Sequence, residues 1–258
     1  MGPRLPLAAA LLAGALVAIA GAQPFEPDVT NGEFHCMRAV SEASVKFVKK
    51  RLACVIKCTK NFWRGKVPES DCMPPSFGGT TLECMTRFRG PDQQFGATIG
   101  ACGSSSCPEC YENGDCSETG AGGTRPAELA SFTDSLLVGL FCQLDGATRP
   151  VQTCERKTTK EFVKMFADVG YCADLCVSLA RRGVVPYSEC TQASSSVLAS
   201  CIAGRIAARI ARIDRACVEA VAGPDFCFGA EYPSGDTWAN LTTIGFVPYF
   251  ALTTYCDS

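Results

Sequence analysis

Cysteine is the residue type that offers this chain the most chemistry. The 258 residues include 18 cysteines and a single histidine, His35. Thiolates bind soft metal ions and act as nucleophiles, but most metal sites and acid–base mechanisms also use imidazole. His35 has no serine or aspartate motif around it, and the chain has no GxSxG, HExxH, phosphate-binding-loop or haem-attachment motif. We therefore expect no catalytic residue, no metal site, no cofactor and no enzymatic activity.

One CxxC motif, with Cys107 and Cys110 at its ends, could still carry thiol-redox chemistry or supply half of a metal site. Two further pairs are spaced four residues apart and could present two thiolates to a soft metal: Cys54/Cys58 and Cys172/Cys176. No second CxxC accompanies the motif, and many cysteines compete for partners. We favour structural disulfides, and keep a thiol-redox or metal-binding protein using Cys107/Cys110 as an alternative.

The first 22 residues predict export. Arg4 is followed by an apolar, Ala/Gly-rich run that ends at the small residues Ala20 and Ala22, which is typical of a secretory signal peptide. No later stretch is long and apolar enough to anchor the mature chain in a membrane. In an oxidising compartment, an even number of regularly spaced cysteines predicts disulfides. We expect a secreted protein, extracellular or, in a bacterium, periplasmic or at the cell surface.

The charges argue against one class of partner and leave another open. With 24 Lys+Arg against 26 Asp+Glu, the chain lacks the positive excess that nucleic-acid binding requires. Two local stripes are nevertheless basic: Lys46, Lys49, Lys50, Arg51 and Lys57, and Arg205, Arg209, Arg212 and Arg215. Such stripes are commonly solvated helix faces, but cationic amphipathic helices also bind anionic membranes. We predict a secreted, non-enzymatic, cysteine-rich binding or structural protein, and keep as an alternative a membrane- or lipid-binding protein that acts through these cationic amphipathic helices. The sequence does not identify the partner, for which a protein surface and a lipid surface are both candidates.

The cysteine spacing predicts a tandem duplication. The pattern C-x17-C-x3-C-x13-C begins at Cys36 and again at Cys154, and both copies contain the string R-G-x-V-P-x-S-[DE]-C. With small shifts in register, four more cysteines of each copy match: Cys84 with Cys201, Cys102 with Cys217, Cys110 with Cys227, and Cys142 with Cys256. Only Cys107 and Cys116 are unmatched. We predict a signal peptide (1–22), a first cysteine-rich repeat (23–147) and a second (148–258).

The elements that must position these cysteines are helices. Apolar and cysteine residues recur on one helical face at positions 36, 40, 43, 47, 54 and 58, and at 154, 158, 162, 165, 169, 172 and 176. Gly65 and Gly183 suit the ends of these helices, and the prolines three residues later, Pro68 and Pro186, prevent continuation. Further helices are expected over 127–141 and from about 195 to 221. The predicted fold class is mainly α, with each repeat a disulfide-stapled helical hairpin that ends in a loop-rich segment.

An antiparallel hairpin also predicts the disulfides. The second repeat would contain Cys154–Cys217, Cys172–Cys201 and Cys176–Cys190; the first, by homology, Cys36–Cys102, Cys54–Cys84 and Cys58–Cys72; the remaining pairs would be Cys110–Cys142, Cys227–Cys256 and Cys107–Cys116. One feature conflicts with this scheme. Cys201 and Cys217 are 16 residues apart, which is about 160° out of phase on an ideal helix. We therefore expect a break near Gly204, like that expected at Gly90-Pro91 in the first repeat.

Overall fold

The computed structural model describes residues 30–87, 89–97, 101–103, 106–108, 111, 116–117, 123–141, 144–191 and 196–221. These residues are mainly helical and include no strand, as the sequence predicts. The elements are α2 (Asn31–Phe62), η1 (Glu69–Asp71), α3 (Gly79–Thr86), η2 (Pro91–Ala97), α5 (Thr124–Leu140), α6 (Arg149–Ala180), α7 (Ser188–Thr191) and α8 (Ser196–Val221). The predicted signal peptide and the segment 222–258 lie outside the described residues.

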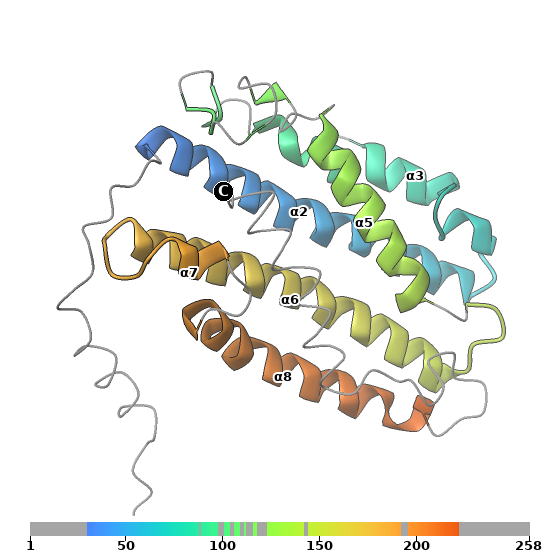
Figure 1. The fold of residues 1–258 in the computed structure, drawn as a ribbon. Coiled ribbons are helices and arrows are strands. Elements are labelled where there is room, and N and C mark those ends of the chain that lie inside the picture. Colours follow the sequence, from blue (N-terminus) through green and yellow to red (C-terminus); the bar gives the residue numbers. More distant parts are fainter. Residues whose placement is uncertain are drawn as a thin grey trace, which may run out of the picture.

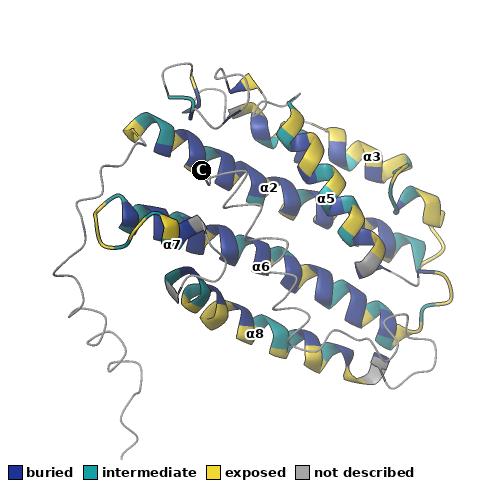
Figure 2. Ribbon diagram, in the orientation of Figure 1, coloured by how far each residue is buried: buried dark blue, intermediate teal, exposed yellow. Residues whose placement is uncertain are grey.

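Three long helices form the main layer of the molecule. Helices α2, α6 and α8 run side by side, and α3 and α5 lie against α2 (Figure 1). Helices α2 and α6 are each 32 residues long, which is about 48 Å at 1.5 Å per residue. The N-terminus of α2 is held by a capping box, in which Thr30 and Glu33 each accept a hydrogen bond from the other's backbone N–H. Every position of the two predicted apolar faces is buried, which confirms the helical periodicity (Figure 2).

Both long helices end in the same glycine turn. Gly65 has a φ of +68°; its N–H donates to the carbonyl of Phe62, and the next N–H donates to Asn61. Gly183 has a φ of +69° and closes α6 with the same two bonds. This is the Schellman motif, which needs a residue that tolerates positive φ without a Cβ clash. The prediction that these two glycines end the helices is confirmed.

Helix α8 corrects one expectation, because it is continuous through Gly204. Gly204 is exposed and nothing would meet a Cβ added there, so no packing forces the backbone to deviate. The two cysteines of α8 reach α6 differently. Cys217 is fully buried, with its Cα 4.5 Å from that of Cys154, whereas Cys201 is only half-buried, 5.9 Å from Cys172. One disulfide thus leaves from the buried face and the other from its edge, and the helix needs no break.

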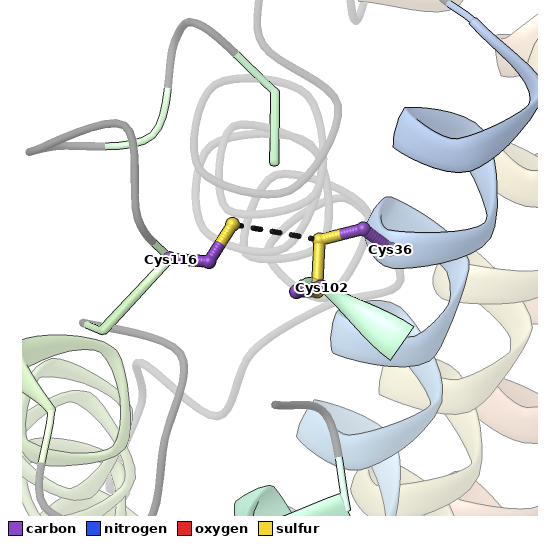
Figure 3. Close-up of side chains that lie close together, drawn as sticks. All are labelled: Cys36, Cys102 and Cys116. Atoms are coloured by element: carbon purple, nitrogen blue, oxygen red, sulfur yellow. Dashed lines mark hydrogen bonds between the residues drawn. A yellow bond between two sulfur atoms is a disulfide. The ribbon is translucent and has the colours of Figure 1, made fainter. Parts of the chain in front are cut away.

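Seven disulfides join described cysteines, and they are seven of the nine pairs that the spacing predicts. Their pairs are Cys36–Cys102, Cys54–Cys84, Cys58–Cys72, Cys107–Cys116, Cys154–Cys217, Cys172–Cys201 and Cys176–Cys190. Each one closes a loop within 30–141 or within 144–221. Figure 3 shows the Cys36–Cys102 bond beside the sulfur of Cys116. The predicted pairs Cys110–Cys142 and Cys227–Cys256 lie outside the described residues.

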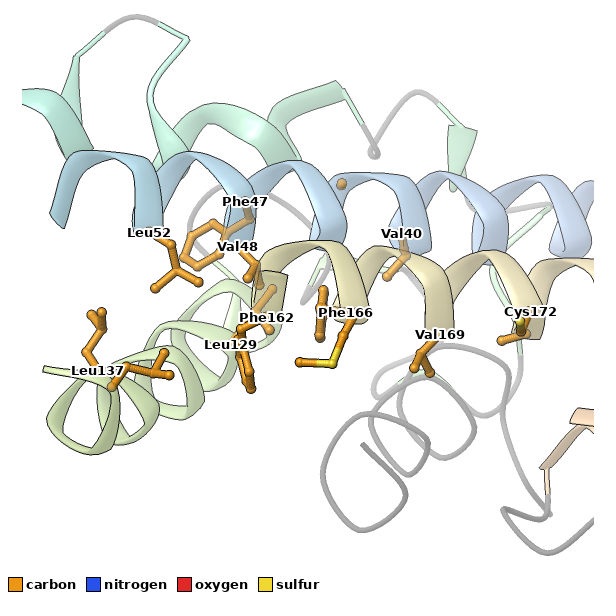
Figure 4. Close-up of a cluster of buried hydrophobic side chains, with 14 of the residues drawn as sticks. Val40, Phe47, Val48, Leu52, Leu129, Leu137, Phe162, Phe166, Val169 and Cys172 are labelled. Atoms are coloured by element: carbon orange, nitrogen blue, oxygen red, sulfur yellow. The ribbon is translucent and has the colours of Figure 1, made fainter. Parts of the chain in front are cut away.

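The apolar core runs through both parts of the chain. Side chains of α2, α5 and α6, among them Phe47, Leu129, Leu137 and Phe162, meet in one cluster (Figure 4). Because α2 precedes and α6 follows residue 147, this cluster joins the two predicted repeats. Burial of these side chains contributes about 2 kcal/mol each to the stability of the fold. The packing of α2 on α6 therefore rests on apolar contact and not on a cross-link between described residues.

Candidate functional site

A groove lies between α2 and α6, lined by residues of both helices. Its volume is about 670 Å³. Among described residues its floor is aliphatic: Val45, Ala53, Ile56, Val163 and Ala167. Its rim consists of cations: Lys49, Lys57, Lys60, Arg156, Lys160 and Lys164. We call this site the cationic groove.

Helical spacing explains why these residues share one face. On α2, positions 45, 49, 53, 56 and 60 are separated by three or four residues, and positions 156, 160, 163 and 167 of α6 follow the same pattern. Each row borders the buried face of its helix. The aliphatic side chains Val45, Ile56, Val163 and Ala167 are half-buried, whereas Ala53 and the lysines are exposed. The small side chains of Ala53 and Ala167 leave space between the helices that larger residues would fill.

Most of the groove's positive charge is unpaired. Lys164 donates to the Glu161 carboxylate at 2.8 Å and is therefore ion-paired. The other five rim cations form no ion pair with a described carboxylate, and no described acidic residue lines the groove. Like charges gathered along a concave, partly apolar surface create a local positive potential, which attracts anions. The groove therefore has the chemistry of an anion site with an apolar floor.

The arginine stripe of α8 has the opposite character. Arg205 and Arg209 contact the Asp168 carboxylate at 3.2 and 3.0 Å, and Arg209 and Arg212 lie 3.7 and 3.6 Å from Glu161. The Glu161 side chain is fully buried. Burial would raise the pKa of Glu161, but hydrogen bonds from Lys164 and Lys157 outweigh it and the pKa is lowered. Three members of this stripe thus form an ion-pair network between α6 and α8, whereas Arg215 is exposed and donates to the Ala211 carbonyl of its own helix.

The first predicted basic stripe divides into paired and unpaired members. Arg51 is buried, makes bidentate hydrogen bonds of 2.7–2.9 Å to Asp134 of α5, and stacks on Phe77. It lies four residues after the core residue Phe47, which places it on the buried face of α2. Lys50 donates to the Arg89 carbonyl. Lys46 pairs with Glu42, so only Lys49 and Lys57 of this stripe line the groove.

Sequence reasoning missed the α6 side of the groove. Arg156, Lys160 and Lys164 are spaced four residues apart, which is a visible basic row. This row becomes one side of a binding groove only when α6 packs beside α2. The cysteine spacing gives no information on that contact, because every predicted disulfide lies within one repeat.

The described cysteines are joined in disulfides, including three whose sulfurs lie close together. The sulfurs of Cys36, Cys102 and Cys116 lie within 4.8 Å of one another, with 3.7 Å between Cys36 and Cys116 (Figure 3). All three are oxidised in disulfides, and no described cysteine is free. A disulfide sulfur lacks the negative charge that makes thiolate a strong ligand and nucleophile. Cys107 is likewise bonded to Cys116, whereas Cys110 lies outside the described residues.

A second, smaller pocket of about 200 Å³ lies further along the contact between α2 and α6. It is lined by Phe34, Arg38, Tyr171, Asp174, Leu175 and Ser178. Burial raises the pKa of Asp174 to about 7, although a hydrogen bond with Ser41 and the charge of Arg38 act in the opposite direction. His35 is exposed at the start of α2, and its ring lies 6.3 Å from that of Phe34. The pocket thus contains one carboxyl group that changes charge near neutral pH.

Comparison with protein-family models, with curated proteins and with solved structures finds no match to this chain. None of the described helices combines the length and the apolar character that crossing a bilayer requires. The described residues define a disulfide-rich helical protein with a cationic groove, and any statement about its function rests on the geometry of that groove.

Proposed function

We propose that this protein is an exported, non-enzymatic, disulfide-stabilised binding protein that takes anionic lipid in its cationic groove. The observation that carries the proposal is the set of five cations, none of them paired with a described carboxylate, around an aliphatic floor between α2 and α6. Aliphatic side chains bind acyl groups through the hydrophobic effect, while lysine and arginine attract anionic headgroups. The described lining residues include no serine, cysteine, histidine or carboxylate that a catalytic mechanism would use.

Export fits the oxidation state of the cysteines. Fourteen described cysteines form seven disulfides, and such bonds persist in oxidising compartments. The apolar run of residues 5–22 is the segment that would direct the chain there. Secretion to the extracellular space, or to the periplasm or cell surface of a bacterium, is part of the proposal.

We also propose that the scaffold arose by tandem duplication. Matched disulfides have nearly equal Cα–Cα distances in the two parts: 4.6 and 4.5 Å, 5.8 and 5.9 Å, and 5.3 and 5.4 Å. The equal lengths of α2 and α6 and their identical glycine turns support the same origin. In this interpretation the groove is a new site, formed where the leading helices of the two copies pack together.

Vesicle co-sedimentation tests the lipid function. We expect the protein to bind phosphatidylglycerol vesicles and not phosphatidylcholine vesicles, with binding that weakens as salt rises. The variant Lys57→Glu/Lys160→Glu should lose at least tenfold in affinity, because it reverses two groove charges. The matched control is Lys66→Glu/Arg182→Glu, which makes the same change in net charge at exposed turn residues outside the groove.

Two results would contradict the proposal. One is equal binding to neutral and anionic vesicles. The other is an equal loss in both double variants, which would mean that net charge and not the groove determines binding. Circular dichroism of each variant checks that the helices remain folded, which is expected because all four side chains are at least partly solvent-exposed.

A further inference from the structure

The two walls of the groove can be aligned, because α2 and α6 are antiparallel. The Arg181 guanidinium stacks on Phe34 at 4.4 Å, and four residues further along α2, Arg38 lines one small pocket together with Asp174, which is seven residues earlier in α6. In the same register, Lys60 lies level with the start of the α6 wall at Arg156. Val45 and Ala167 then form the opposite end of the groove.

This alignment gathers most of the rim cations at one end of the groove, while the aliphatic floor runs along its whole length from Val45 to Ile56. Four unpaired cations, Lys57, Lys60, Arg156 and Lys160, gather at one end. The other end is formed by Val45 and Ala167, and its lining cations are Lys49 and Lys164, of which Lys164 is paired with Glu161. A membrane-surface helix would instead carry its cations along the whole polar face. A polar end followed by an apolar channel matches the head and tail of a single amphiphilic molecule.

The dimensions agree with one acyl chain. From Val45 to Lys60 the α2 wall rises by about 22 Å at 1.5 Å per residue. A bilayer core of about 30 Å contains two leaflets, so one acyl chain spans about 15 Å and leaves room for a headgroup. The volume of about 670 Å³ falls in the range of about 300–1,000 Å³ that holds one small ligand. Docking on a flat membrane needs no such volume.

We propose that the cationic groove binds one molecule of a single-chain anionic amphiphile, such as a fatty acid. The headgroup lies among Lys57, Lys60, Arg156 and Lys160, and the acyl chain extends over Ala53 and Val163 towards Ala167. The proposal rests on the lipid function above and adds to it the ligand class, the stoichiometry and the orientation.

Titration calorimetry of the full chain with monomeric myristate, below its micelle concentration, tests this directly. We expect saturable binding of one molecule, about tenfold weaker binding of dodecanoate because two methylenes are lost, and no binding of a zwitterionic amphiphile of equal chain length. Lys57→Glu/Lys160→Glu should weaken myristate binding at least tenfold. Lys66→Glu/Arg182→Glu should change it less than twofold.

The variant Ala167→Trp tests the orientation. A tryptophan at the apolar end would block the last part of the chain, so myristate should bind about tenfold more weakly while decanoate is unaffected. Equal losses for both chain lengths would overturn the orientation, because the headgroup would then lie at this end. Retained decanoate binding also shows that the variant is folded.

Failure of this inference is distinguishable from failure of the lipid function. Binding to anionic vesicles without binding of monomeric myristate would overturn the single-ligand proposal and leave the lipid function standing. Absence of both would overturn both. Native mass spectrometry adds a further check: a dimer that Lys57→Glu/Lys160→Glu dissociates, with no bound amphiphile, would assign the groove to a second copy of this chain and contradict the proposal.

Discussion

The segments that pack against α2 and against α6 differ in structure, although disulfides at corresponding positions attach them. Cys172–Cys201 and Cys154–Cys217 attach one continuous helix, α8, to α6. The equivalent bonds on α2 attach α3, through Cys84, and Cys102, which lies five residues after the short helix η2; the helical path is interrupted between Thr86 and Pro91. Matched Cα–Cα distances across the two sets agree within about 0.1 Å. Cross-links therefore fix where a segment meets its helix, and the residues between them determine its path.

Local chemistry explains the interruption. Arg89 has a φ of +64°, a conformation unfavourable for a side chain with a Cβ, and Pro91 has no N–H to continue a helix. The Arg89 carbonyl accepts a hydrogen bond from Lys50 of α2. In α8 no proline occurs, and its arginines bind Asp168 and Glu161 of α6.

The largest expected effect comes from breaking corresponding long-range disulfides. Cys36→Ser/Cys102→Ser opens a separation of 66 residues and Cys154→Ser/Cys217→Ser one of 63, and loop entropy alone predicts a loss of about 4 kcal/mol for each. We expect the first variant to lose at least about 1 kcal/mol more, because α3 and η2 are too short to be stable as isolated helices whereas α8 has 26 residues. Urea unfolding followed at 222 nm measures both. Equal losses would mean that segment length has no influence.

Glu161 is the next test, since it holds α8 to α6 by charge. Glu161→Gln should reduce the free energy of unfolding by about 3 kcal/mol, because four cations then lose a buried partner. Glu42→Gln, in an exposed pair with Lys46, is the control and should cost less than about 0.5 kcal/mol.

The effect of Glu161 should also depend on pH. The pKa of Glu161 is lowered in the folded protein. Its contribution to the free energy of unfolding is therefore complete at pH values above the pKa of the unfolded chain, and is lost as the pH falls through the pKa of the folded state. The difference between wild type and Glu161→Gln should therefore shrink in acid. A difference that grows in acid would contradict this account of the network.

Asp174 should act in the opposite direction. The folded protein keeps this proton up to about pH 7, whereas the unfolded chain releases it near 3.8, so the free energy of unfolding should fall as pH rises between these values. Asp174→Asn should remove that fall and be about 2 kcal/mol more stable than wild type at pH 8, with little difference at pH 3. Asp145→Asn, at an exposed position, is the control. Parallel stability profiles for wild type and Asp174→Asn would refute the prediction.

The smallest effect compares one substitution in the two segments. Gly204→Ala should stabilise the protein by about 1 kcal/mol, because α8 is continuous and a Cβ there meets nothing within 4 Å. Gly90→Ala should be destabilising, since its Cβ would lie 2.5 Å from the Met85 carbonyl oxygen and 2.8 Å from that of Arg87. Thermal unfolding measures both, and a shift of the same sign in the two variants would contradict the comparison.

Periodicity and spacing predict the parts of the fold that depend on one helix or one hairpin. The buried face from Cys36 to Cys58, the glycine turns and seven disulfides follow from residues close in sequence or matched between the two parts. The continuity of α8 was not predicted. An ideal helical wheel places Cys201 and Cys217 on opposite sides of the helix, and it takes no account of a disulfide formed at the edge of an interface.

The groove was only half visible in the sequence. Lys49 and Lys57 stood out as basic, but nothing in the spacing of Arg156 or Lys160 places them across from α2. Arg51 was wrongly grouped with the exposed cations, because its partner Asp134 lies 83 residues away. Charge pairing between distant helices depends on tertiary packing, which local patterns do not encode.

Hydrogen-exchange mass spectrometry of the full chain, with and without myristate, tests the central claim most directly, because it locates the ligand. Binding in the groove predicts added protection in the backbone of residues 45–60 and 156–167, and none in 196–221. Protection confined to α8, or to the Asp174 pocket, would contradict the assignment of the groove as the ligand site.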